Sequence, residues 1–315
     1  GISEASLINI STGEASGPFA VQDLPTLPTR LQPGESVSFG IRFRPSAPGV
    51  SSTTLRVDST QFVLSGTASA LPPLPSYRFS IPSGNIGALE QPLVGLQLSQ
   101  PYPVALTGIL TLTQEAVGFV SDPSVRFSNG AQSVNFTIAA NSTQAVFANG
   151  ASGVRLQTGS VAGTISLRAS FSVATTALSD DNPEVLRLTI NPAAPRVLSA
   201  QAVPASANVL NLVVTGLSLS RSLTKMDIEL RPVAGVNLSA TRFSLNLEGE
   251  SFVWFRSAAS QAAGGIFAIQ VPLNFSISGN TTTTGVSALI ETIASIQVNL
   301  SNETGTSSPF VIELR

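Results

Sequence analysis

The sequence predicts an all-β protein made of tandem Ig-like antiparallel β-sandwiches. Three observations support this prediction: apolar and polar residues alternate, turn residues recur between the alternating segments, and helix signals are scarce. Successive side chains of a strand point to opposite faces, so alternation with a period of two buries one face and exposes the other. Strands that recur about every 8–12 residues between turns are typical of a sandwich or a barrel.

The alternation is clearest in four segments whose polar positions hold mainly Ser, Thr, Asn and Arg. These segments, each predicted to be a strand, are 37–44, 134–138, 165–171 and 296–300. Asn-Gly pairs at 129–130 and 149–150 predict turns, the first of them in a hairpin, because both residue types tolerate a positive φ. The best candidate for a short helix is 285–294, and a weaker one is 257–263; a loop is the alternative for both segments.

Two proline-rich segments, 71–75 and 191–195, divide the chain. Such segments are stiff and extended, which suits spacers between domains. The predicted domains are therefore 1–70, 71–194 and 195–315. The last two have about the length of an Ig-like sandwich, whereas the first is short.

The composition excludes several functions. The 315 residues include no Cys and no His, so the chain lacks a Ser-His-Asp triad, disulfides and the usual ligands of zinc and copper. A net charge of −2, with 11% charged residues, gives no electrostatic signature of nucleic-acid binding. No apolar run approaches the roughly 20 residues of a membrane span. A non-catalytic protein is the expectation.

The N-terminal segment carries an ordered set of short motifs. They are Gly17-Pro18-Phe19, Pro33-Gly34, Phe43-Arg44-Pro45 and Leu64-Ser65-Gly66. Over residues 5–68, a fifth of the chain, this segment resembles the ASH-type Ig-like domain, also known from bacterial choice-of-anchor D proteins. The resemblance implies an antiparallel sandwich with a non-catalytic role in a secreted or surface-anchored bacterial protein.

The segment departs from that family at its start, because residues 5–10 resemble the third strand of the family. We expect four or five strands between Ile10 and Gly66, fewer than the roughly seven of an Ig-like fold. The chain is then a fragment, a domain completed by a strand from a neighbouring subunit, or a reduced variant. The residues expected at the open edge are Leu7, Ile10, Phe19 and Val21.

The densest polar cluster lies at residues 179–184. Its carboxylates, Asp180, Asp181 and Glu184, are oxygen ligands of the kind that Ca²⁺ prefers. The cluster lacks the spacing of an EF-hand, so an Asp-rich turn before a strand is the alternative. Calcium is the one cofactor that the sequence suggests.

Two further features could indicate a function that involves carbohydrates. Glu248 and Glu250 would share a face of a strand, as a glycosidase pair would, but any alternating Glu pair does so, and an ordinary turn is the preferred interpretation. Trp254, the only Trp, lies in the bulky segment 252–255, which predicts a strand buried on both faces; an exposed Trp254 would instead suit stacking on sugars. Gly264-Gly265 is predicted to be a turn before the next strand.

We therefore expect an extracellular or cell-surface structural protein of a bacterium: a spacer, an adhesion module or a fibre-forming module. One alternative is a filament subunit completed by strand donation, and another is a carbohydrate-binding module. The expected partners are further copies of the chain or neighbouring domains of the same surface protein, with carbohydrate as an alternative ligand. Nucleic acid and a membrane span are not expected.

Overall fold

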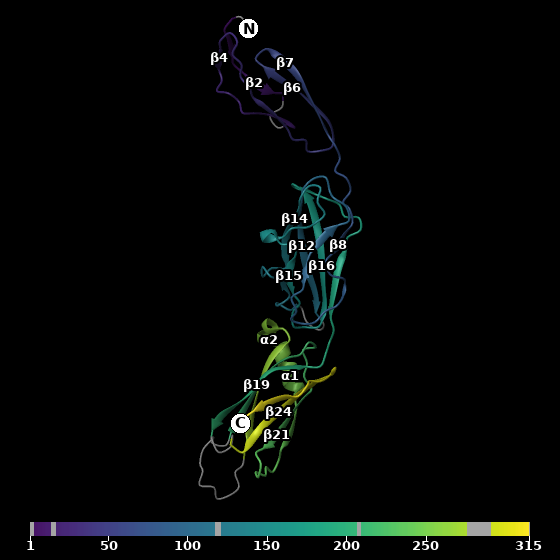
Figure 1. Cartoon of the computed structure of the whole chain (residues 1–315), viewed down its shortest axis with the longest axis vertical. Helices are drawn as coiled ribbons and strands as arrows, with labels where there is room; N and C mark the ends of the chain where they lie inside the picture. The colour runs from purple at the N-terminus through teal and green to yellow at the C-terminus, as the bar shows by residue number, and fades with distance from the viewer. Residues whose placement is uncertain (1–2, 14–16, 117–120, 207–208, 276–290, 315) are drawn as a thin grey trace. The chain divides into compact units, whose positions relative to one another are not determined.

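The computed structural model describes residues 3–13, 17–116, 121–206, 209–275 and 291–314 (Figure 1). It contains two compact units, Gly1–Pro73 and Leu74–Arg315, and the boundary between them lies in the first proline-rich segment. Antiparallel strands dominate both units. The prediction of an all-β chain of Ig-like antiparallel sandwiches is confirmed.

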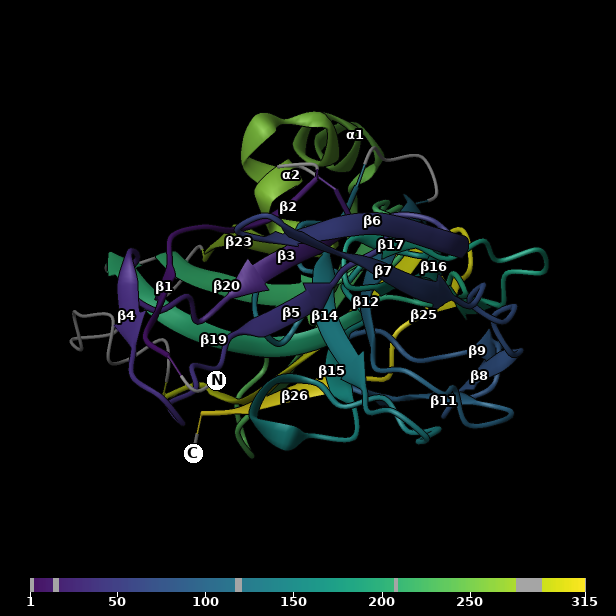
Figure 2. The ribbon, with the colours of Figure 1, turned by 90° about the horizontal axis from the view of Figure 1, so that it is seen from above.

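The described residues of unit 1 form seven mostly short strands. They are β1 (Ala5–Leu7), β2 (Ile10–Thr12), β3 (Phe19–Gln22), β4 (Thr29–Leu31), β5 (Gly40–Phe43), β6 (Gly49–Val57) and β7 (Thr60–Ala68). They pair as β1-β4, β3-β5 and β2-β6-β7, and β6 and β7 form the long hairpin that is visible in Figure 2. The small core consists of Leu7, Ile10 and Leu55, with partly buried side chains around them.

The expected strand count of unit 1 was wrong. Between Ile10 and Gly66 the described residues form six strands, β2 to β7, in place of four or five. The alternating pattern missed strands such as β4, because three residues are too few to show a period of two. The pattern also placed a strand start at 37, whereas β5 begins at Gly40.

The first part of unit 2 is a sandwich that we call the middle sandwich. Its strands are β8 (Tyr77–Phe79), β9 (Gly84–Asn85), β10 (Leu93–Val94), β11 (Leu96–Leu98), β12 (Leu106–Ala116), β13 (Arg126–Phe127), β14 (Ser133–Ile138), β15 (Val154–Gln157), β16 (Gly163–Val173), β17 (Thr176–Ala177) and β18 (Val185–Ile190). One sheet has the order β14-β12-β16-β18-β9, with β17 beside β16, and the other layer holds β10-β15-β13 and β11-β8. The predicted strands at 134–138 and 165–171 are confirmed.

The turn at Asn129-Gly130 does not close a hairpin. β13 pairs with β15, whereas β14 pairs with β12, so the turn carries the chain from one sheet to the other. Gly130 has a φ of 81°, and the Asn129 side chain accepts a hydrogen bond from the Ala131 amide at 3.0 Å. The Asn-Gly signal predicted the turn correctly but not the pairing of the strands on either side of it.

The second part of unit 2 is the third sandwich. Its strands are β19 (Arg196–Ser206), β20 (Val209–Leu217), β21 (Lys225–Pro232), β22 (Arg242–Asn246), β23 (Ile266–Asn274), β24 (Ile293–Asn302), β25 (Gly305–Thr306) and β26 (Phe310–Glu313). One sheet is β19-β20-β23, and the other is β22-β21-β24-β25, with β26 also beside β24. The predicted strand at 296–300 lies within β24 and is confirmed.

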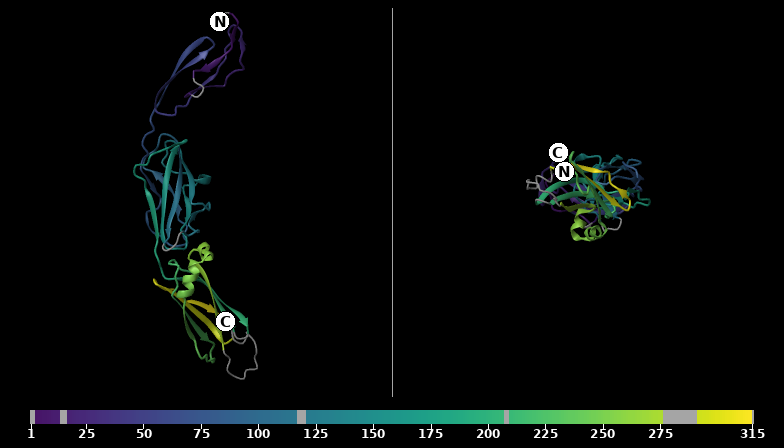
Figure 3. Two further views of the ribbon diagram at one scale, coloured as in Figure 1. Left: turned by 180° about the vertical axis from the view of Figure 1, so that it is seen from behind. Right: turned by 90° about the horizontal axis from the view of Figure 1, so that it is seen from below.

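Two helices, α1 (Glu248–Arg256) and α2 (Ala258–Ala263), connect β22 to β23. They lie at one end of the third sandwich, as Figure 3 shows in green. The predicted helix at 257–263 is confirmed by α2. Of the other candidate, residues 285–290 lie outside the described residues, and Ile293 and Ala294 belong to β24, not to a helix.

A phenylalanine ring covers a central glycine in each sandwich of unit 2. Gly108 faces Phe136 across β12 and β14, and Gly216 faces Phe267 across β20 and β23. A Cβ on Gly216 would overlap the Phe267 ring and would lie only 2.9 Å from the Arg196 carbonyl oxygen. The absence of a side chain therefore makes room for the ring in the core.

We expect Gly216→Ala to lower the free energy of unfolding of the third sandwich by about 1–3 kcal/mol, because the Phe267 ring must leave its position. Urea unfolding followed by circular dichroism measures the change. Gly249→Ala is the matched control: a Cβ there meets nothing within 4 Å, and alanine favours α1 by roughly 0.5–1 kcal/mol. Equal effects of the two substitutions would contradict the packing argument.

Candidate functional site

The residues of the predicted calcium site form a local turn. The Asn182 amide donates to Asp180 Oδ1 at 3.2 Å, and Ser179 Oγ donates to Asp181 Oδ1 at 3.3 Å. Within the described ranges, no group of three or more His, Cys, Asp or Glu residues is arranged to hold a metal ion. The contacts of Asp180, Asp181 and Glu184 are those of an Asp-rich turn. Calcium binding here stays a prediction, with no coordination geometry in its favour.

Tyr77 connects this turn to the core of the middle sandwich. The ring is buried, and its hydroxyl donates to the Glu184 carbonyl oxygen at 3.4 Å. Burial, together with the nearby charge of Asp180, raises the pKa of Tyr77. The phenol therefore stays protonated at neutral pH and acts as a hydrogen-bond donor that holds the turn in place.

The apolar residues expected at an open edge of unit 1 lie in its interior instead. Leu7, Ile10 and Phe19 are buried, and Val21 is half-buried against the small core. The exposed apolar side chains are on the long hairpin: Phe62 is 50% exposed and Val63 is 80% exposed. Both belong to β7, which pairs only with β6 among the described strands. Three successive apolar residues at 62–64 were the sequence signal for this edge.

Trp254 lies in a helix, so the prediction of a strand buried on both faces was wrong. In α1, Phe252 and Val253 point to solvent and Trp254 is 37% exposed, while Phe255 packs into the core. Acidic residues in the first turn and Arg256 in the last turn favour the helix through its dipole. A run of bulky residues does not distinguish a short helix from a buried strand.

Glu248 and Glu250 lie in the first turn of α1, and both are exposed. Two residues along an α-helix are rotated by about 200°, so the two carboxylates point in different directions. They therefore do not form the facing pair that a glycosidase needs. The predicted turn was also wrong, because a helix occupies these positions.

An apolar hollow of about 290 Å³ lies beside Trp254. Its walls come from one side of α1 and from residues 267–272 of the edge strand β23. Trp254, Phe255 and Glu250 lie on the helix side of the hollow. Gln270 lies on the β23 side and, with Glu250, provides a polar group on a long side chain. The hollow therefore combines a partly exposed indole ring with a few hydrogen-bonding groups.

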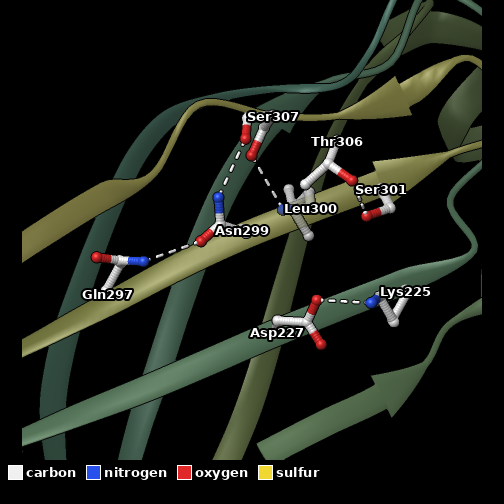
Figure 4. A network of polar contacts seen from close by, with 8 residues as sticks. All are labelled: Lys225, Asp227, Gln297, Asn299, Leu300, Ser301, Thr306 and Ser307. Carbon is white, nitrogen blue, oxygen red and sulfur yellow. Dashed lines mark hydrogen bonds and ion pairs between the residues drawn. The ribbon is translucent and has the colours of Figure 1, made fainter. Parts of the chain in front are cut away.

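Polar side chains make a set of contacts along the inner strands β21 and β24 of the third sandwich, as Figure 4 shows. Asn299 Nδ2 donates to the Ser307 carbonyl oxygen at 3.0 Å, and Ser307 Oγ accepts from the Leu300 amide at 3.0 Å. Lys225 Nζ lies 2.8 Å from Asp227 Oδ2, and the hydrogen bond from Lys225 lowers the pKa of Asp227. These groups bind one another along the strands, which is a stabilising arrangement.

A deeply buried polar site lies where the two sandwiches of unit 2 meet. At its centre is Asp122, which is 1% exposed. One carboxylate oxygen accepts from the Ser124 amide and hydroxyl at 2.9 and 2.5 Å. The other accepts from the amide and hydroxyl of Ser160 at 2.5 and 2.9 Å. Four hydrogen bonds thus hold a carboxylate that has almost no contact with water.

Ser160 connects these hydrogen bonds to the third sandwich. Its hydroxyl accepts a hydrogen bond from the Gly265 amide at 3.0 Å, 105 residues along the chain. Nearby, the Ala162 amide donates to the Leu219 carbonyl oxygen at 2.9 Å. A Cβ on Gly265 would lie 2.7 Å from the Ser218 carbonyl oxygen, so only glycine allows this close approach. The predicted turn at Gly264-Gly265 is therefore also a contact point between sandwiches.

Arg221 completes the junction from the third sandwich. Its buried guanidinium donates to the carbonyl oxygens of Phe255 and Gly264, and to Ser260 Oγ at 3.1 Å. Burial lowers the pKa of Arg221, whereas the negative charge of Asp122 raises it. We call Asp122, Ser160, Arg221 and Gly265 the junction network. Sequence reasoning missed it, because Asp122 and Arg221 carry no motif.

Comparison with known proteins identifies no family. No family model matches the chain, and no curated protein matches it. Among solved structures, the class 5 fimbriae chaperone CfaA is 8% identical, with a TM-score of 0.26 over 76% of this chain and 98% of the chaperone. Immunoglobulin domains 1–5 of Sidekick-1 are 12% identical, with a TM-score of 0.26 over 99% of this chain and 55% of theirs.

Domains 4–9 of the surface layer protein SbsC are 10% identical, with a TM-score of 0.24 over 87% of this chain and 36% of that protein. With TM-scores of this size, the similarity does not indicate a shared function. Separately, none of the helices within the described ranges is long and apolar enough to cross a membrane.

Proposed function

We propose that the chain is a non-catalytic structural protein of an extracellular or cell surface, in which β-sandwiches serve as spacer, adhesion or fibre-forming modules. The junction network is the observation that supports this proposal. A buried carboxylate binds Ser160, the Ser160 hydroxyl accepts from the Gly265 amide of the third sandwich, and the buried guanidinium of Arg221 binds the adjacent Gly264 carbonyl oxygen. Such a connection suits a protein that holds modules in place.

The family resemblance of residues 5–68 supports the same proposal at a finer level. An ASH-type domain in a bacterial surface protein would be a non-catalytic module, and the Phe43 ring packs against Gly66, two residues of the motifs that carry the resemblance. This assignment to the ASH type remains a proposal.

The location is tested on intact cells that express the protein from its own gene. Brief treatment with an external protease should remove the protein, while a cytoplasmic marker remains intact. An antibody against unit 2 should label the same cells without permeabilisation. Protection from the protease until the cells are lysed would overturn the proposed location.

A fibre-forming protein would associate with further copies of itself, and the exposed edge strand β7 of unit 1 supports such self-association. A strand from a second copy would pair with the free side of β7 and cover Phe62 and Val63. We expect the mass measured by light scattering to rise with concentration, and Val63→Lys to abolish the rise. Val50→Lys is the control, because Val50 is 73% exposed on the neighbouring strand β6, opposite Thr67 and away from Phe62 and Val63. A monomer at all concentrations would overturn this self-association.

Carbohydrate binding is a second candidate, which the partial exposure of Trp254 favours. An indole ring beside a hollow with Glu250 and Gln270 can stack on a sugar and hydrogen-bond its hydroxyls. Because the chain has one Trp, its fluorescence reports this site alone. Neutral oligosaccharides should shift or quench the emission, and Gln270→Ala should weaken the effect. An emission that no oligosaccharide changes would overturn this candidate.

A further inference from the structure

A polar hollow of about 530 Å³ lies on the middle sandwich, far along the chain from Trp254. Its lining includes Gln91, Arg126, Ser128, Asn129, Arg155 and Gln157. Two of these residues are positively charged and none is negatively charged. In a chain of net charge −2, this combination marks the hollow as a place for an anion.

The sheet register places both arginines on the same face. Arg126 of β13 lies directly opposite Gln157 of β15, and their neighbours Phe127 and Leu156 point into the core. Arg155 is two residues from Gln157 along β15, so it shares that outer face. Arg126 and Arg155 are then diagonal neighbours with Cα atoms about 7–8 Å apart, a spacing at which both guanidinium groups can reach one ligand.

The hollow is partly organised by its own hydrogen bonds. Arg155 Nη1 donates to the Gln91 carbonyl oxygen at 3.1 Å, and Gln91 Nε2 donates to Gln157 Oε1 at 3.1 Å. A guanidinium has five N–H donors, so this bond orients Arg155 and leaves donors for a ligand. The turn at Asn129-Gly130 closes one side, held by the Asn129 contacts to Ala131 and Ser133.

No carboxylate of the described residues neutralises these two charges. The ion pairs found in those ranges are Arg30–Glu4, Lys225–Asp227 and Arg242–Glu229, and none involves Arg126 or Arg155. Planar guanidinium groups match carboxylates in geometry, and the amides and hydroxyl of Gln91, Gln157 and Ser128 match hydroxyl groups.

We propose that this hollow binds a carboxylate-bearing sugar, such as a uronic acid unit of an acidic polysaccharide. The ligand's carboxylate would lie between Arg126 and Arg155, and its ring hydroxyls would face Gln91 and Gln157. The volume is within the range of small-molecule sites, roughly 300–1,000 Å³. The inference goes beyond the proposed structural function and does not depend on it, because the site is defined by the middle sandwich alone.

The test measures binding of the full chain to polygalacturonate by calorimetry and by affinity electrophoresis. We expect binding that weakens with added salt, and at least about tenfold weaker binding by the double variant Arg126→Gln/Arg155→Gln, because charged hydrogen bonds are lost. Arg168→Gln is the matched control: Arg168 is an exposed arginine of β16 on the other sheet, so its variant should bind like the unmodified chain. Thermal unfolding confirms that each variant is folded.

Further ligands distinguish an acidic sugar from an acidic peptide as the source of the bound carboxylate. Neutral dextran should not bind, and poly-glutamate should compete poorly because it lacks ring hydroxyls. Equal competition by poly-glutamate would overturn the assignment to a sugar in favour of an acidic peptide. No binding of polygalacturonate, or equal binding by the double variant, would overturn the site. Trp254→Ala should leave the affinity for polygalacturonate unchanged, which separates this site from the Trp254 hollow.

Discussion

Asp122→Ala is expected to lower the free energy of unfolding of unit 2 by about 3–5 kcal/mol. The substitution removes the acceptor of four hydrogen bonds and leaves the buried amide of Ser160 and the part-buried amide of Ser124 without it. It also removes the negative charge that favours the buried guanidinium of Arg221.

Urea unfolding of the full chain measures this loss, and hydrogen exchange locates it. The amides of Ser160 and Gly265, which donate within the junction network, should exchange much faster in the variant. Asp227→Ala is the control: it removes an acidic residue from a solvent-accessible ion pair, where a loss of at most about 1 kcal/mol is expected. A similar loss in both variants would show that the junction network does not stabilise unit 2.

The fold was predictable from the sequence because its signal is local. β14, β16 and β24 each show a period of two over at least five residues, and the packing of one buried face requires that period. The same rule failed where elements are short or stand at the end of a sandwich. β4 has three residues, and α1 buries only Ser251 and Phe255, so neither shows a full period.

The sites were less predictable because their residues are distant in the sequence. Ser160 lies 38 residues from Asp122 and 105 from Gly265, and nothing around any of them differs from an ordinary turn. Arg126 and Arg155 meet only because β13 and β15 pair, a pairing that the Asn129-Gly130 turn signal pointed away from. The sequence singled out Trp254 because it is the only Trp. The exposure of its side chain depends on α1, a helix that the run of bulky residues at 252–255 did not predict.

Unit 1 should unfold at a lower urea concentration than unit 2. Among the described residues, its core cluster has three buried apolar side chains, compared with 23 and 15 in the two clusters of unit 2. Burial of each large apolar side chain contributes roughly 1.5–3 kcal/mol, so unit 1 has far less to offset the entropy of ordering its chain. A domain of this size is marginally stable even with a complete core.

Limited trypsin digestion followed by mass spectrometry measures this difference, because unit 1 contains exposed arginines, among them Arg30 and Arg56. We expect rapid cleavage in unit 1 and a persistent fragment that contains most of residues 74–315. Leu55→Ala, which costs about 2–5 kcal/mol, should leave unit 1 unfolded without changing that fragment. Leu110→Ala in the middle sandwich is the reciprocal control and should not alter cleavage of unit 1.

A single cooperative unfolding transition of the whole chain would contradict this prediction. If association through β7 stabilises unit 1, cleavage at Arg30 and Arg56 should slow as the protein concentration rises, because binding of a second copy favours the folded form of unit 1. Val63→Lys should then abolish this protection, whereas Val50→Lys should retain it. The same digestion thus measures the weakness of the small core and identifies whether a second copy compensates for it.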